Sequence, residues 1–247
     1  MKWNPNTYDE KHPFISEYGK DLLSFLPTKS EQKILDIGCG TGTLTSQLAS
    51  YGEVLGIDGS EEMIRQAQEN FPTINFQVQD ALTMTYKNQW DIVFSNAAFH
   101  WISNHEKLIY NIEQALTSQG KLICEFGAKG NIQIVEESFQ EALLPFNVEY
   151  HSKFTFPTVD SFQHFLNKNG FTVDQIYDFP RPTVLSGGQI GLINFAKQFF
   201  ETELSSFNSE EQLEILTRFE ENARGKLWQK TQWVTDYRRL RVISSKP

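Results

Sequence analysis

The chain has 247 residues, of which 39% are hydrophobic, so it is long enough to fold around a core of its own. Its net charge of -9 argues against a broad nucleic-acid surface, because phosphate contacts need clustered Lys and Arg. Its two cysteines do not have the spacing of metal ligands. The sequence has neither the apolar core of a signal peptide nor a run of about 18 apolar residues that could span a membrane. These features predict a reduced cytoplasmic protein with no nucleic-acid partner, no membrane partner and no metal.

The first patterned segment is an amphipathic helix predicted over residues 14–26, where apolar side chains recur every four residues. Pro27 ends this helix. Trp3 and Tyr8 precede it in a polar segment and lie outside its apolar stripe.

Residues 34–44 predict a buried strand, a glycine-rich turn and the start of a helix. The glycines of the turn are Gly38, Gly40 and Gly42. Alternating glycines allow unusual backbone angles and a close approach of the main chain to a ligand. A dinucleotide fingerprint would place its third glycine at position 43, where the chain has Thr43. An ordinary strand-to-helix turn is the alternative interpretation.

The second predicted strand, residues 53–58, ends in an acid. Asp58 lies 20 residues after Gly38. In nucleotide-binding α/β folds, an acidic residue at about this distance from the glycine turn accepts hydrogen bonds from the ribose hydroxyls. The alternative is that Asp58 caps the next helix, but Ser60 is available as a good N-cap. Ribose binding is therefore the preferred role for Asp58.

The third and fourth predicted strands, residues 76–81 and 90–96, end at further polar groups. Asp80 closes the third strand. Ligands in open α/β sheets bind outside the carboxyl ends of the strands. The loop after the fourth strand is therefore expected to lie beside the part of the ligand that reacts. His100 in this loop is either functional or a satisfied buried histidine, and Trp101 is expected to form a wall.

The remaining chain alternates strands and helices before a patterned insertion. The expected elements are a helix at 105–116, a strand at 120–126, helices at 134–144 and 159–169, and strands at 171–179 and 233–244. Between the last two strands, helical periodicity predicts a compact insertion rather than a linker. It is interpreted as a cap over the active site, with a dimerisation element as the alternative.

The pattern D-x-G-x-G-x-G at residues 36–42, followed by acids after the second and third strands, resembles the class I S-adenosylmethionine-dependent methyltransferases. The opening W-N-P-x-x-Y is similar to that of the trans-aconitate methyltransferase group. The resemblance implies an α/β fold with a Rossmann-like doubly wound seven-stranded sheet, mostly parallel with the last strand antiparallel. It also implies an N-terminal helical lid and a helical insertion before the last strand. The expected ranges are 1–30 for lid and leading helix, 31–180 for the cofactor-binding core, 181–230 for the cap and 231–247 for the final strand.

The same resemblance implies S-adenosyl-L-methionine as cofactor, S-adenosyl-L-homocysteine as product, and a set of binding residues. These residues are Tyr8, Asp36, Gly38, Cys39, Gly40, Asp58, Gly59, Met63, Asp80, Ala81, Leu82, Asn96 and Ala97. Within this set, Asp80 takes the exocyclic amine of adenine and the Ala81 amide binds a ring nitrogen. Asn96 contacts the methionine end of the cofactor, and Tyr8 belongs to the lid.

Methyl transfer from a sulfonium is an in-line displacement that needs a base only if the acceptor must lose a proton. His100 is the expected catalytic base if one is used, with His12 as a second candidate. A carboxylate acceptor would need a guanidinium. Four arginines are candidates for that role: Arg181, Arg238, Arg239 and Arg241.

The predicted function is methylation of a small-molecule acceptor by a monomer or homodimer, with O-methylation of a carboxylate as the leading example. One alternative is a carboxylate carried on a carrier protein. Another is a non-catalytic S-adenosylmethionine-binding regulatory protein. A nicotinamide-dependent oxidoreductase is disfavoured by Thr43 and Asp36. Amino methylation of nucleic acid is disfavoured because residues 95–98 lack an N-P-P-Y-type motif.

If Tyr8 belongs to a lid, deletion of residues 1–13 should speed the release of S-adenosylmethionine and leave the fold intact. The release rate is measured by stopped-flow fluorescence, with circular dichroism as the control for folding. An unaltered release rate would reject the lid.

Overall fold

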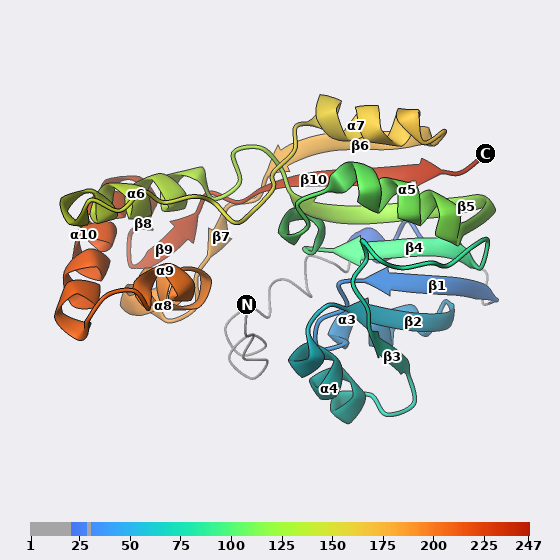
Figure 1. Ribbon diagram of the computed structural model, residues 1–247, viewed down its shortest axis with the longest axis horizontal. Helices are drawn as coiled ribbons and strands as arrows, with labels where there is room; N and C mark the ends of the chain where they lie inside the picture. Colours follow the sequence, from blue (N-terminus) through green and yellow to red (C-terminus); the bar gives the residue numbers. More distant parts are fainter. Residues whose placement is uncertain (1–20, 29–30) are drawn as a thin grey trace. The chain divides into compact units, whose positions relative to one another are not determined.

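The computed structural model describes residues 21–28 and 31–247 (Figure 1). The chain divides into two compact units. The sheet unit takes in the described residues up to 129, residues 154–178 and residues 239–247. The helical unit takes in residues 130–153 and 179–238. Tyr8, Trp3, His12 and most of the predicted leading helix lie outside the described residues.

The sheet unit is built on a seven-stranded sheet in the order β3-β2-β1-β4-β5-β10-β6. Its strands are β1 (Gln32–Ile37), β2 (Gly52–Asp58), β3 (Asn75–Val78), β4 (Trp90–Asn96), β5 (Leu116–Gly127), β6 (Thr172–Pro180) and β10 (Arg238–Ser245). The β3-β2-β1-β4-β5 strands pair in parallel, and β10 pairs antiparallel with β5. The predicted doubly wound sheet with an antiparallel last strand is confirmed.

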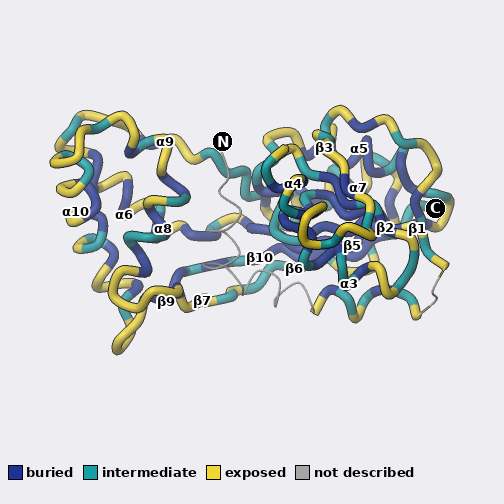
Figure 2. The backbone as a smooth tube through the Cα atoms, turned by 90° about the horizontal axis from the view of Figure 1, so that it is seen from below, coloured by how far each residue is buried: buried dark blue, intermediate teal, exposed yellow. Residues whose placement is uncertain are grey.

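Successive side chains of each strand point to opposite faces of the sheet. Apolar side chains therefore lie on both faces, and helices cover both. The helices are α3 (Thr43–Leu48), α4 (Glu61–Asn70), α5 (His105–Ala115) and α7 (Val159–Lys168), with a 3-10 turn η1 (Phe99–Trp101) after β4. Leu35 packs in one core with side chains of α5 and α7, whereas its neighbour Ile34 packs in another with side chains of α3. The central strands β1, β4 and β10 are mostly buried, whereas the edge strands β3 and β6 are largely exposed or half-buried (Figure 2).

The helical unit joins two separated stretches of chain. It contains α6 (Gln133–Leu143), η2 (Leu144–Phe146), η3 (Gly188–Ile190), α8 (Gly191–Phe199), α9 (Glu201–Leu204), α10 (Ser209–Leu227) and a small sheet of β7 (Thr183–Val184), β9 (Gln232–Thr235) and β8 (Trp228–Gln229). In its core Phe139 of α6 stacks on Phe200 at 4.1 Å and meets Phe219 of α10 edge-on. Residues 130–153, which the sequence predicts as part of the cofactor-binding core, belong instead to the same compact unit as the insertion.

The prediction of one continuous strand at 233–244 is wrong, because the chain breaks between β9 and β10. At the break the Asp236 carboxylate accepts a hydrogen bond from the Ile134 amide at 2.7 Å, near the start of α6. The Arg238 amide donates to the Asn131 side chain at 2.9 Å. The backbone carbonyls of Asp236 and Tyr237 also accept from the amides of Ile132 and Arg181 rather than from a neighbouring strand of the large sheet. β9 and β10 therefore belong to different sheets.

No helix in residues 21–28 and 31–247 is long and apolar enough to cross a membrane.

A buried ion pair links the antiparallel strand to the parallel part of the sheet. Arg241 of β10 lies in register with Glu125 of β5, and its Nε donates to the Glu125 carboxylate at 2.7 Å. Glu125 is 1% exposed and Arg241 is 8% exposed. Removing one member of such a pair leaves an uncompensated buried charge.

Replacement Arg241→Met should therefore lower the free energy of unfolding by about 3–5 kcal/mol. The double variant Glu125→Leu/Arg241→Met should recover most of this loss, because no buried charge is left alone. Urea unfolding measures both. Arg218→Met, which removes an exposed pair with Glu214, is the control and should cost about 0–1 kcal/mol. A loss below about 1 kcal/mol for Arg241→Met would contradict the argument.

Candidate functional site

The glycine turn between β1 and α3 has the unusual backbone that the sequence predicts. Gly38, Gly40 and Gly42 have φ of 75°, 54° and 84°, in the left-handed region that favours glycine. A Cβ at Gly38 would lie 2.2 Å from the Cβ of Ala98, and one at Gly42 would lie 2.7 Å from the ring of Phe76. Among residues 21–28 and 31–247, no atom lies within 4 Å of a Cβ built at Gly40. The described part of the chain therefore leaves the main chain at Gly40 uncovered on this side.

Asp58 at the end of β2 is hydrogen-bonded directly to this turn. One carboxylate oxygen accepts from the Gly40 amide at 3.1 Å, and the other accepts from the Ser60 amide at 2.9 Å. Burial raises the pKa of Asp58, while these amides oppose the rise. Ser60, rather than Asp58, is the N-cap of α4, since its hydroxyl accepts from the Met63 amide. The carboxylate thus lies where β1 and β2 end side by side.

Asp36 lies in β1, two residues before Gly38 of the turn. It is 2% exposed, and it accepts a hydrogen bond from the Thr45 hydroxyl of α3 at 2.7 Å. Burial raises the pKa of Asp36 to about 7, and the charge of Asp58 contributes in the same direction. Two carboxyl groups beside one turn favour a cationic ligand, because a nearby positive charge stabilises both carboxylates. Thr45 was not singled out from the sequence.

The acid-Ala pair after β3 is part of a tight turn. The Asp80 carboxylate accepts from the Leu82 amide at 2.8 Å, and Asp80 is exposed whereas Ala81 is buried. Asn111 of α5 stabilises this turn, because its side-chain amide donates hydrogen bonds to the carbonyls of Ala81 and Leu82, each at 2.9 Å. The sequence analysis missed Asn111, although a polar residue within the apolar stripe of a helix was the available signal.

The loop after β4 begins at the carboxyl end of that strand, at the same edge of the sheet as the ends of β3, β2 and β1. Ala97 has a φ of 57°, and its amide donates to the carbonyl of Glu125 at 2.7 Å. The half-buried Asn96 precedes it, and Ala98 lies against Gly38. Because β3, β2, β1 and β4 are parallel neighbours, the predicted residues at their carboxyl ends share one edge of the sheet. Gly59 directly follows β2 at this edge, and Met63 is a buried residue in the first turn of α4.

His100 is a buried, neutral histidine at that edge. Its Nδ1 accepts a hydrogen bond from the Gly127 amide at 3.3 Å, so the proton of the neutral ring is on Nε2. Its pKa is well below the ordinary value, first because of burial and then because of the charges of Arg239 and His105. In this state His100 offers a donor at Nε2, while the lone pair that a base would use is occupied. Its assignment as a catalytic base stays a prediction.

Three half-buried aromatic rings, which we call the aromatic wall, surround His100: Trp101, Phe154 and Phe156. Their ring centres lie 5.6–6.0 Å from that of His100. Phe154 meets Trp101 at 4.6 Å and stacks on Phe156 at 5.4 Å. The Thr155 amide donates to the His100 carbonyl at 2.8 Å, which fixes the two phenylalanines beside the ring. The sequence analysis expected a wall only from Trp101, and the alternation F-T-F was the overlooked signal.

The four candidate arginines have different positions. Arg181 and Arg238 belong to the helical unit, and Arg241 is paired with Glu125. Arg239 is 5% exposed and lies in register with Gly127, the last residue of β5. Of the four, Arg239 is the one whose charge acts on His100.

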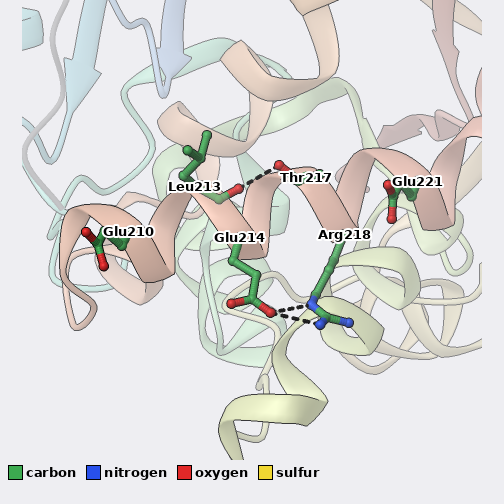
Figure 3. A pocket seen from close by; sticks show the side chains of 6 residues that line it. All are labelled: Glu210, Leu213, Glu214, Thr217, Arg218 and Glu221. Carbon is green, nitrogen blue, oxygen red and sulfur yellow. Dashed lines mark hydrogen bonds and ion pairs between the residues drawn. The ribbon is translucent and has the colours of Figure 1, made fainter.

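A shallow depression in the helical unit carries none of the predicted site residues (Figure 3). It is lined by Glu210, Leu213, Glu214, Thr217, Arg218 and Glu221, all from α10. The contacts drawn there, Arg218 with Glu214 and Thr217 with Leu213, lie within the helix itself. Across the described chain, no cluster of three or more His, Cys, Asp or Glu side chains is arranged to hold a metal ion.

Comparison with known proteins assigns this site to a class. A family model described as a methyltransferase domain matches residues 28–170, and the chain therefore belongs to that methyltransferase family. It is a class I S-adenosylmethionine-dependent methyltransferase, as the glycine turn and the strand-end acids predict. The expected likeness to the trans-aconitate group is also confirmed.

Particular relatives cover different shares of the chain. It is 28% identical to an uncharacterized methyltransferase of Schizosaccharomyces pombe, over 99% of this chain and 98% of that one. It is 32% identical to the trans-aconitate 2-methyltransferase of Variovorax paradoxus, over 49% of each chain. Among solved structures, the YcgJ protein of Bacillus subtilis has a TM-score of 0.64 at 16% identity, over 95% of this chain and 99% of that one. The last comparison shows the shared fold.

The raised pKa of Asp36 should make stability depend on pH. Between about pH 4 and pH 7 the unfolded Asp36 loses its proton while the folded one keeps it, so the free energy of unfolding falls as pH rises. Asp36→Asn removes this cost. Its stabilising effect should be about 2–3 kcal/mol larger at pH 8 than at pH 5.

Urea unfolding at the two pH values measures the effect of Asp36→Asn. Asp174→Asn, at an exposed position of β6, is the matched control. Equal effects of Asp36→Asn at both pH values would show that Asp36 is already ionised at pH 5.

Proposed function

We propose that S-adenosylmethionine binds at the sheet edge formed by β3, β2, β1 and β4, and that its methyl group passes to a carboxylate of a small-molecule acceptor. The observation that carries the cofactor site is the contact between Asp58 and Gly40. It places a carboxylate beside the position of the glycine turn whose main chain the described residues leave uncovered. The product would be S-adenosylhomocysteine and a methyl ester.

Each part of the cofactor has a matching group at this edge. Asp58 accepts hydrogen bonds from the two ribose hydroxyls, since its oxygens keep further lone pairs beside the amides they already bind. Asp80 accepts from the exocyclic amine of adenine, and Met63 borders the ring. Asp36, with its pKa of about 7, responds to the positive charge of the ligand by releasing its proton. Asn96 and Ala97 flank the methionine end.

The chemistry of a carboxylate acceptor agrees with the state of His100. A carboxylic acid is ionised at neutral pH, so its oxygen attacks without a base. The positive sulfonium and the negative carboxylate neutralise each other during transfer, and a pocket that excludes water and aligns them contributes most of the rate. His100, uncharged and with Nδ1 occupied, need not move a proton.

A carboxylate acceptor is also consistent with the relatives. The Variovorax paradoxus protein is named for its action on trans-aconitate, a carboxylic acid. Since that match covers half of each chain, it supports a carboxylate but does not carry the particular acid over. The lid role of residues 1–30 and the cap role of residues 181–230 remain proposals.

Replacement Asp58→Ala should weaken the binding of S-adenosylmethionine by about 1.5–3 kcal/mol, because charge-assisted hydrogen bonds to the ribose are lost. Isothermal titration calorimetry measures the affinity, with NAD as the ligand control. Asp174→Ala, an exposed acid in β6, is the matched variant and should bind as the wild type does. Unchanged affinity in Asp58→Ala would remove Asp58 from the site.

A transfer assay separates the enzyme from a regulatory binding protein. The purified protein is incubated with methyl-labelled S-adenosylmethionine and a panel of carboxylic acids, and labelled ester is extracted. Ester formation supports the proposal. Tight cofactor binding with no labelled ester from any acid would contradict carboxylate methylation.

A further inference from the structure

We propose that His100 binds the acceptor: its Nε2–H donates a hydrogen bond to one carboxylate oxygen, while the other oxygen attacks the methyl group. The inference rests on the proposed function and deepens it, because it assigns the group that holds the acceptor. It also excludes proton transfer by His100, so the acceptor class is limited to groups that are ionised before they bind.

The contacts of His100 determine how its ring is turned. Nδ1 accepts from the Gly127 amide at 3.3 Å, and the His100 carbonyl accepts from the Thr155 amide at 2.8 Å. The two nitrogens of an imidazole lie on opposite sides of the ring, so the Nε2–H points away from the Gly127 amide. Within residues 21–28 and 31–247, no group accepts a hydrogen bond from it. The described part of the chain therefore leaves this donor for another acceptor.

A second buried histidine shows what a structural donor does nearby. His105 lies five residues later, and its Nε2 is 2.9 Å from the Phe99 carbonyl, to which it donates. Burial lowers the pKa of both histidines, so both rings are neutral near pH 7. His105 thus gives its Nε2–H to the main chain, whereas the same group of His100 has no acceptor in the described chain. Polar groups in apolar surroundings are hydrogen-bonded as a rule, and exceptions mark functional sites.

The position of His100 in the fold places it beside the proposed methionine end of the cofactor. It belongs to η1, which follows β4, and it comes four residues after Asn96, where that strand ends. Through Gly127 the ring is attached to the end of β5, the parallel neighbour of β4. Ligands of such sheets bind beyond the carboxyl ends of the strands. An acceptor at this edge therefore lies next to His100.

The aromatic wall strengthens a hydrogen bond made by this donor. Its ring centres lie 5.6–6.0 Å from that of His100 and keep the surroundings apolar. In a low local dielectric, a hydrogen bond to a charged oxygen is stronger than it is in water. An amine acceptor would instead direct its own N–H groups at the Nε2–H. The donor and its surroundings therefore select an acceptor that presents an oxygen lone pair.

The transfer step then balances without a base. The oxygen that His100 does not hold uses a lone pair to form a bond to the methyl carbon. The bond from that carbon to sulfur breaks, and its electron pair stays on sulfur in the neutral thioether. No proton moves, and the ester offers His100 only an uncharged carbonyl oxygen. Because a hydrogen bond to an ionised oxygen is roughly twice as strong, His100 favours substrate over product.

Two replacements separate the two edges of the ring. His100→Gln places an amide N–H near the position of Nε2 and gives the Gly127 amide no acceptor at the position of Nδ1. His100→Asn does the opposite, because its carbonyl oxygen lies near the position of Nδ1 and its amide does not reach that of Nε2. The whole 247-residue chain is assayed with methyl-labelled S-adenosylmethionine and three acids, benzoate, hexanoate and trans-aconitate. The acid with the highest wild-type kcat/KM is used for the variants, and calorimetry gives their cofactor affinity.

The donor role predicts opposite results for the two variants. His100→Gln should keep the KM for the acid within about twofold of wild type, with the wild-type pH profile of kcat/KM. His100→Asn should raise that KM about tenfold or more, because a charge-assisted hydrogen bond is lost, with kcat and cofactor affinity within about threefold. His164→Asn, at an exposed position of α7, is the control and should match the wild type.

Each contrary result is distinct. A raised KM in His100→Gln, or an unchanged KM in His100→Asn, overturns the inference and leaves His100 as a structural partner of Gly127. Loss of kcat in both variants overturns it in favour of a catalytic base. If one variant does not fold, the KM of the other decides alone. A wild type that binds no S-adenosylmethionine, or that methylates none of the three acids, overturns the proposed function itself and the inference with it.

Discussion

The hydrogen bond between the Asp58 carboxylate and the Gly40 amide joins the end of β2 to the turn after β1, across 18 residues of chain. This contact exists only because Gly38, Gly40 and Gly42 adopt positive φ, which turns the main chain back toward β2. Any side chain at Gly38 would collide with Ala98 after β4. The turn therefore fixes the spacing of β2, β1 and β4 together, and the edge at which the cofactor is proposed to bind depends on it.

Burial makes this edge electrostatically unusual. Asp36 and Asp58 share one turn, and removal from water raises the pKa of both. A protein that needed only stability would place apolar groups there. Instead this edge keeps two acids, and the Thr45 hydroxyl and the amides of Gly40 and Ser60 offset part of the cost of burying them. A nearby positive charge, such as the sulfonium of the proposed cofactor, would stabilise both carboxylates further.

The sequence predicted the features that follow from local pattern. Strand periodicity and the acids at strand ends sufficed for the strands and the glycine turn, because each signal lies within a few residues. The antiparallel direction of the last strand was implied by the resemblance to the methyltransferase family and not by local pattern. The sequence did not predict the break at Asp236, since that carboxylate caps a helix about a hundred residues earlier in the chain. Nor did the sequence show that Arg239 and Arg241 occupy different environments. Only the register of β10 against β5 shows that one faces Glu125 while the other reaches the strand end.

The interleaved make-up of the two units has a consequence for how the chain is synthesised. The helical unit needs α6 and also α10, and the capping group for α6 comes from Asp236. The sheet unit needs β10, which pairs with β5 more than a hundred residues earlier in the sequence. Neither unit holds all its parts until residues 236–245 have been synthesised, so both close through long-range contacts, which form slowly. Neither unit is therefore expected to be obtained by cutting the chain at a single position.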